Sequence, residues 1–75
     1  KAEVMEVVVS SDASFVDKPL SRAGLPAGSL IGTIIRGNEI IIPHGDSRIM
    51  ANDRVIAFCS SEASPGLRRA LGLKA

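Results

Sequence analysis

The sequence offers few residues for the disulfide or metal cross-links that stabilise many small folds. Cys59 is the single cysteine, so no disulfide can form within the chain. His44 is the single histidine, which leaves a histidine–cysteine zinc cage short of ligands. A chain of 75 residues buries only about 60% of its unfolded surface, and a core of that size is marginal. Self-association is the remaining way to stabilise it, and we therefore expect a homodimer.

Aromatic side chains and an excess of positive charge are also missing. Tyr and Trp are absent, so Phe15 and Phe58 are the only rings on which a base could stack. Nine basic and eight acidic residues give a net charge of +1, and the excess comes from Arg68, Arg69 and Lys74 near the C-terminal end. No basic stripe follows a phosphate backbone. The composition predicts that the domain binds no nucleic acid polymer.

Long hydrophobic runs are absent as well. Runs such as Val7–Val9, Ile40–Ile42 and Val55–Cys59 fall far below the about 18 residues of a membrane helix, and nothing resembles a signal peptide. We therefore expect a soluble, cytoplasmic segment, with which the single cysteine is compatible. The chain begins at Lys1, close to an apolar run, which suggests a piece of a longer polypeptide or a processed chain.

The β-branched residues that are present predict most of the structure. Strands are predicted at Val4–Val9 and Val55–Cys59, because both runs are apolar and end at polar turn residues. Leu30–Ile35 and Ile40–Ile42 flank Gly37-Asn38, a pair that is typical of a tight hairpin turn. These runs together predict a mainly antiparallel sheet.

Proline and glycine mark two short helices. Pro19 suits the first turn of a helix over 19–23, and Gly24 suits the left-handed residue that ends it. A second helix is predicted over 64–72, with Ser64 as its N-cap. The element order is therefore β-α-β-β-β-α. The fold class is α+β, a small antiparallel sheet with two short helices that dimerises.

Two details of the hairpin can be predicted. Gly32 inside the first strand suggests a bulge or a close approach of two backbones. Arg36 and Glu39 should face each other across the turn, as an exposed salt bridge that contributes less than about 1 kcal/mol.

No catalytic constellation stands out, and we predict that the domain is not an enzyme. Cys59 with His44 is the single Cys–His pair, and burial in an apolar strand would suppress the reactivity of the thiol. We favour a structural role for Cys59 and a solvated loop position for His44, with a ligand contact of His44 as the alternative. Four aspartates beside turns are expected to bind nearby backbone amides rather than a metal or substrate: Asp12, Asp17, Asp46 and Asp53.

The order and spacing of these features resemble the TrkA C-terminal domain, also called the C-lobe of the RCK domain, which regulates potassium conductance. Residues 28–49 and 52–58 carry most of the resemblance, which extends over about residues 3–72. Its elements are a leucine-containing segment from Pro19 to Pro26, a strand, a tight turn, a second strand that ends at Pro43, and the acidic Asp53 before the last strand. Each motif is weak alone, but their order and spacing together are specific.

The sequence departs from the family pattern at two places. Asn52 stands where the family often has glycine, and the hairpin turn reads Gly37-Asn38 instead of the commoner Asn-Gly. Asn tolerates a left-handed conformation, so the first departure does not threaten the fold. The second concerns the type of turn, which depends on the order of these two residues.

The resemblance implies that residues 1–75 form a single regulatory domain that pairs with itself. The expected function is that of a cytosolic module of a potassium or other ion transport protein. Its expected partners are a channel or transporter subunit in the membrane and, in the parent chain, a Rossmann-type N-lobe. The alternative is a purely structural dimerisation domain within a membrane carrier, with no ligand. An enzyme fragment is disfavoured, because the catalytic constellation is missing.

In some members of this family the dimer groove binds a small effector such as cyclic di-AMP. The resemblance therefore implies a ligand region for a cyclic dinucleotide, and no other cofactor, at seven positions: Ile31, Ile34, Arg36, Asn38, Ile40, Pro43 and His44. Arg36 is the candidate for the phosphate, because a guanidinium forms bidentate hydrogen bonds to phosphate. The alternative for the isoleucines is a place in the core of the monomer or dimer.

Overall fold

The computed structural model describes residues 1–14 and 16–72 of the chain. Phe15 and Lys74, which entered the argument on stacking and charge, lie outside the described residues. The elements in chain order are β1 (Ala2–Val8), a 3₁₀ helix η1 (Leu20–Arg22), β2 (Ser29–Arg36), β3 (Glu39–Ile41), β4 (Arg54–Ser60) and α1 (Ser64–Ala70). No helix among these elements is long and apolar enough to cross a membrane.

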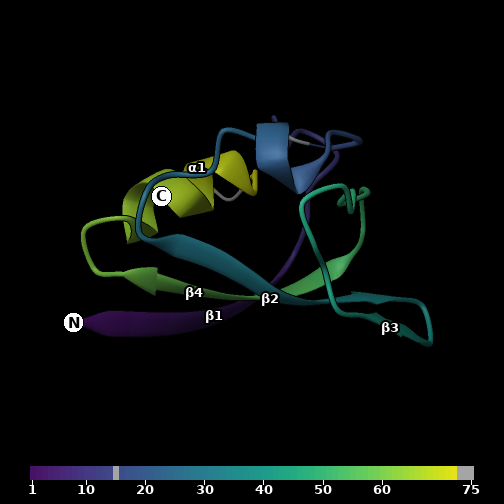
Figure 1. The fold of residues 1–75 in the computed structure, drawn as a ribbon, viewed down its shortest axis with the longest axis horizontal. Helices are drawn as coiled ribbons and strands as arrows, with labels where there is room; N and C mark the ends of the chain where they lie inside the picture. The colour runs from purple at the N-terminus through teal and green to yellow at the C-terminus, as the bar shows by residue number, and fades with distance from the viewer. Residues whose placement is uncertain (15, 73–75) are drawn as a thin grey trace.

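The strands form one antiparallel sheet in the order β1-β4-β2-β3. Figure 1 shows α1, η1 and the connecting loops on one side of this sheet, while no described segment covers its other side. The predicted α+β class with a small antiparallel sheet is therefore confirmed for the described residues.

The core lies between the sheet and this covering layer. Every second residue of the central strands points into it, as the period of a strand requires. Its fully buried members include Ile34 and Val55 from the strands, Leu67 from α1 and Ile49 from a loop. Cys59 is 4% exposed and belongs to the same cluster, which confirms the structural interpretation of this thiol.

The first predicted helix is wrong as an α-helix, because the chain forms only a three-residue 3₁₀ helix there. The N–H groups of Leu20 and Ser21 donate to the carbonyl oxygens of Ser47 and Gly45, both at 2.9 Å. These bonds tie the segment to a distant loop instead of to its own turns. Gly24 follows at φ 71°, which confirms the left-handed residue that ends the turn. Residues 1–14 and 16–72 therefore contain one α-helix, where two short helices were predicted.

The start of α1 also differs from the prediction. Ala63 is the N-cap and Ser64 is already helical, while the hydroxyl of Ser60, the last residue of β4, accepts from the Ala63 N–H at 3.2 Å. The helix ends at Ala70. Gly72 follows at φ 83° and donates its N–H to the carbonyl of Arg69 at 3.0 Å, so the predicted glycine stop is confirmed.

The hairpin has the predicted register and the predicted bulge. Arg36 lies opposite Glu39, and the pairing of β2 with β4 shifts between Ile31 and Thr33, on either side of Gly32. The ring of Phe58 explains the glycine, because a Cβ at Gly32 would lie 2.6 Å from its Cε2 atom. The predicted Arg36–Glu39 salt bridge is wrong, since the guanidinium of Arg36 turns to a buried carboxylate instead, as described below.

Candidate functional site

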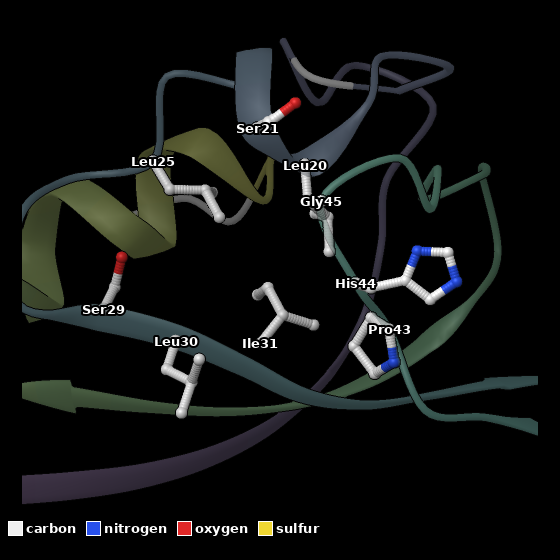
Figure 2. Close-up of a pocket in the computed structure, with 9 residues that line it drawn as sticks. All are labelled: Leu20, Ser21, Leu25, Ser29, Leu30, Ile31, Pro43, His44 and Gly45. Carbon is white, nitrogen blue, oxygen red and sulfur yellow. The ribbon is translucent and has the colours of Figure 1, made fainter.

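A cavity of about 300 Å³ opens at the edge of the sheet, between β2, η1 and the loop that follows β3 (Figure 2). Its lining comprises Leu20, Ser21, Leu25, Ser29, Leu30, Ile31, Pro43, His44 and Gly45. The walls are mostly apolar, and a few serine and histidine groups supply polarity. Small-molecule sites have this composition and begin at about this size.

The cavity exists because β3 is shorter than β2. β3 pairs only with residues 34–36 of β2, so the earlier part of β2 has an edge without a neighbouring strand among the described residues. Pro43 lacks an N–H and cannot continue a ladder. The chain leaves the sheet before this proline and runs toward η1. In Figure 2, Ile31 points into the resulting space, while Leu30 points to the opposite side of β2.

Backbone hydrogen bonds hold the loop that forms the second wall. The N–H of His44 donates to Oγ of Ser47 at 3.0 Å, and the N–H of Ser47 donates to the carbonyl of His44 at 2.9 Å. The bonds from η1 to Ser47 and Gly45 then fix this loop against the 3₁₀ helix. The loop wall of the cavity is therefore held by backbone hydrogen bonds together with the hydroxyl of Ser47.

His44 is the most polar group of the lining. Its imidazole side chain is 73% exposed, and Nδ1 forms an ion-pair contact with the equally exposed carboxylate of Asp46. The interpretation of His44 as a solvated loop residue is thus confirmed. The same exposure keeps its ring accessible to a molecule in the cavity.

Arg36 lies at a different place and has a different partner. Its Nε donates to Oδ1 of Asp53 at 2.9 Å, and its Nη2 donates to Oδ2 of the same residue at 2.8 Å. Nη2 also donates to the carbonyl of Arg48 at 2.9 Å. The edge of the guanidinium that would grip a phosphate in a bidentate manner is therefore occupied by a carboxylate.

Asp53 is a buried carboxylate, 1% exposed, that this contact keeps ionised. Burial alone raises its pKa, but the hydrogen bonds from Arg36 and from the Met50 N–H, together with the charge of Arg36, outweigh that effect. The pKa of Asp53 is consequently held below its ordinary value. Its Oδ2 accepts the Met50 N–H at 2.8 Å, which confirms for this aspartate the predicted bond to a turn amide.

The structure brings three of the seven predicted ligand residues to the cavity: Ile31, Pro43 and His44. Ile34 is fully buried in the core, and Ile40 is 69% exposed on the uncovered face of the sheet. Asn38 lies in the hairpin turn, away from the lining. Whether any of the seven binds a ligand stays a prediction.

Sequence reasoning missed the rest of the lining, above all Leu20, Ser21 and Leu25. The two leucines belong to the leucine-containing segment of the family pattern, and that pattern was the one feature of the sequence that could have indicated them. No local pattern predicted that this segment would contact the loop after Pro43, because the backbone hydrogen bonds that join them link residues more than twenty positions apart in the sequence. The described residues contain no group of His, Cys, Asp or Glu that could hold a metal ion.

Comparison with known proteins identifies similar sequences and similar solved structures. The Trk system potassium uptake protein TrkA homolog 1 of Methanosarcina mazei is 39% identical over 64 residues, which is 85% of this chain and 14% of that protein. A solved structure of an RCK domain with cda has a TM-score of 0.77 at 25% identity, and covers 89% of this chain and 94% of its own.

A second solved structure has the same fold at lower identity. It is the RCK_C domain dimer of S. agalactiae BusR in complex with c-di-AMP, with a TM-score of 0.80, 19% identity, and coverage of 95% of this chain and 91% of its own. The TrkA-C domain family itself matches residues 4–72. The resemblance expected from the sequence is confirmed, and the chain belongs to the TrkA-C domain family.

Proposed function

We propose that this domain is a regulatory module of a potassium or other ion transport protein, and that it binds a cyclic dinucleotide in the cavity beside β2. The supporting observation is that Ile31, Pro43 and His44, which the family pattern predicted for the ligand, line one preformed cavity. The likeness to an RCK domain with cda and to a BusR dimer with c-di-AMP supports the class of ligand.

The chemistry of the cavity suits part of such a ligand. Its apolar walls can take the face of a nucleobase, and the exposed imidazole of His44 can bind a phosphate or a base edge. A cavity of about 300 Å³ is small for a whole dinucleotide. A ligand built from two identical halves would therefore join two copies of the domain, with one half in each cavity.

The expected setting of the module follows from its relatives. The chain spans 14% of the Methanosarcina mazei protein, so we propose that it is one domain of a longer protein. A membrane transporter subunit or segment and a Rossmann-type N-lobe are the proposed partners. The proposed location is the cytoplasmic side of the transport system.

Isothermal titration calorimetry with cyclic di-AMP tests the ligand. We expect saturable binding with one dinucleotide for two chains, and no saturation with AMP at the same concentration. His44→Ala should weaken binding roughly tenfold to a hundredfold, the range for a lost hydrogen bond to a charged group. Ser11→Ala is the control, since this exposed residue is neither in the lining of the cavity nor among the predicted ligand positions and should leave binding unchanged.

Two outcomes would contradict the proposal. The absence of saturation with cyclic di-AMP, while the protein remains folded and dimeric, would favour the purely structural dimerisation domain. Equal affinities of His44→Ala, Ser11→Ala and wild type would place the ligand elsewhere than in this cavity.

A further inference from the structure

One wall of the cavity is made of two segments, residues 17–21 and 45–49, that pair with each other. The N–H groups of Asp17, Leu20 and Ser21 donate to three carbonyl oxygens of the second segment, each at 2.9 Å. Leu20 and Ser21 belong to the lining of the cavity, so this pairing places them there. We call the two segments together the paired wall.

Arg36 holds the paired wall from its other side. The carbonyl oxygens of Ser47 and Ile49 accept from residues 17–21. The carbonyl oxygen of Arg48, between them, accepts instead from Nη2 of Arg36 at 2.9 Å. Consecutive carbonyl groups point to opposite edges in this way in a strand that has a neighbour on each edge. The guanidinium of Arg36 therefore supplies the donor on the edge that faces away from residues 17–21.

Asp53 fixes the guanidinium in that position. Its carboxylate is buried and accepts from Nε and Nη2 of Arg36 at 2.9 and 2.8 Å, and the second hydrogen of Nη2 is left for Arg48. Asp53 is itself held by the sheet, because its carbonyl accepts the Val9 N–H at 2.8 Å and because it directly precedes β4. The Arg36 side chain thus joins the paired wall to the sheet.

We propose that Arg36 is a positioning residue for the cavity, which holds the paired wall in place without contacting the ligand. Arg36 does not belong to the lining, and the edge of its guanidinium that would bind a phosphate lies on Asp53. The inference rests on the proposed function only where it links the wall to ligand binding. A ligand that contacts Leu20 and Ser21 needs the wall in place, so the loss of Arg36 would weaken binding from outside the cavity.

Hydrogen exchange of the ligand-free protein, followed by NMR for individual amides, tests this role. Arg36→Ala should speed exchange at the three paired N–H groups of residues 17–21 roughly tenfold or more beyond any change at Leu71, whose N–H donates to Leu67 of α1. A loss of global stability alone would not single out the wall. A residue that only contacts a phosphate would leave the exchange of the ligand-free protein unchanged.

Two control variants separate the role of Arg36 from the loss of a charge and from the loss of stability. Arg54→Ala removes a cation whose partner, Glu6, is exposed at 3.1 Å, and should leave the exchange of the wall unchanged. Met5→Ala removes volume from the buried core on β1 and should not act selectively on the wall. If Arg36→Ala changed the exchange of the wall and of Leu71 by the same factor, the positioning role would be overturned.

Calorimetric titration with cyclic di-AMP, on variants that circular dichroism shows to be folded, tests the link to the ligand. Arg36→Ala should raise the Kd roughly threefold to tenfold, the equivalent of one lost hydrogen bond, because part of the binding free energy must restore the wall. Arg54→Ala should keep the Kd of the wild type. An unchanged Kd for Arg36→Ala would overturn the inference. Weaker binding without a selective change in exchange would also overturn it, because Arg36 would then contact the ligand directly.

The two experiments also distinguish this inference from the proposed function. A wild type that binds no cyclic di-AMP would contradict the proposed ligand. Selective exchange of the wall in Arg36→Ala would still support the positioning of the wall in that case, because the exchange experiment uses no ligand.

Discussion

Removal of the Arg36 guanidinium should destabilise the fold more than removal of any exposed cation. The Asp53 carboxylate that it contacts is almost fully buried and recovers only part of its hydration when its partner is lost. The remaining donor to this carboxylate, the Met50 N–H, engages only Oδ2. Arg36→Ala would thus leave Oδ1 without the partner it has in the wild type.

The size of this effect follows from the burial of the two partners. Breaking a fully buried ion pair by deleting one partner costs about 3–5 kcal/mol. The Arg36 side chain is 41% exposed, so water can approach the freed carboxylate, and we expect a cost of about 2–3 kcal/mol. Asp53→Ala should cost a similar amount, since it also removes the acceptor of the Met50 N–H. The double variant should lose less than the sum, because the two side chains form one contact.

Urea unfolding followed by circular dichroism, at one protein concentration for all variants, measures these losses. Arg48→Ala is the control, because Arg48 donates only to the exposed backbone carbonyl of Asp17 and lies 3.8 Å from its Oδ1, and both side chains are largely exposed. Its cost should be below about 1 kcal/mol. If Arg36→Ala were no more destabilising than Arg48→Ala, the view of Asp53 as a carboxylate stabilised by Arg36 would be wrong.

The same pair predicts how stability depends on pH. The pKa of Asp53 is lower in the folded protein than its ordinary value of 3.8, so the unfolded chain takes up the proton first as the pH falls. The stabilisation is therefore complete above about pH 4–5 and declines as the pH decreases through the folded pKa. Asp53→Asn should reduce the decline of the urea midpoint that the wild type shows as the pH is lowered from 6. An unchanged decline in the variant would contradict the role given to the Asp53 carboxylate.

Two further substitutions test the interior of the sheet. Cys59→Ser should lower the free energy of unfolding by about 1–3 kcal/mol, because it buries a hydroxyl among apolar side chains. The heat of ligand binding should stay unchanged. A folded variant that no longer binds the ligand would give Cys59 a role in the site. Gly32→Ala should lower the free energy of unfolding by about 1–3 kcal/mol, since its Cβ would overlap the Phe58 ring. The double variant with Phe58→Leu should recover part of that loss. Equal stability of the wild type and Gly32→Ala would refute the contact.

The strands were predictable from the sequence because their signals are local. Runs of β-branched residues, the Gly37-Asn38 turn and the bulge at Gly32 all act within a few positions, and each was confirmed. The helix over 19–23 was not predictable in the same way. Its N–H groups are taken by carbonyl oxygens of residues 45 and 47, and no pattern within 19–23 indicates that competition.

The candidate site was predicted in part for the same reason. The family resemblance implied Ile31, Pro43 and His44 as ligand positions, and the predicted end of a strand near Ile42 agrees with the place of Pro43 and His44 just after β3. Arg36 shows the limit of such reasoning. Its type and position suit a phosphate, but the acceptor it meets is seventeen residues away, in a turn brought close by the pairing of β2 with β4.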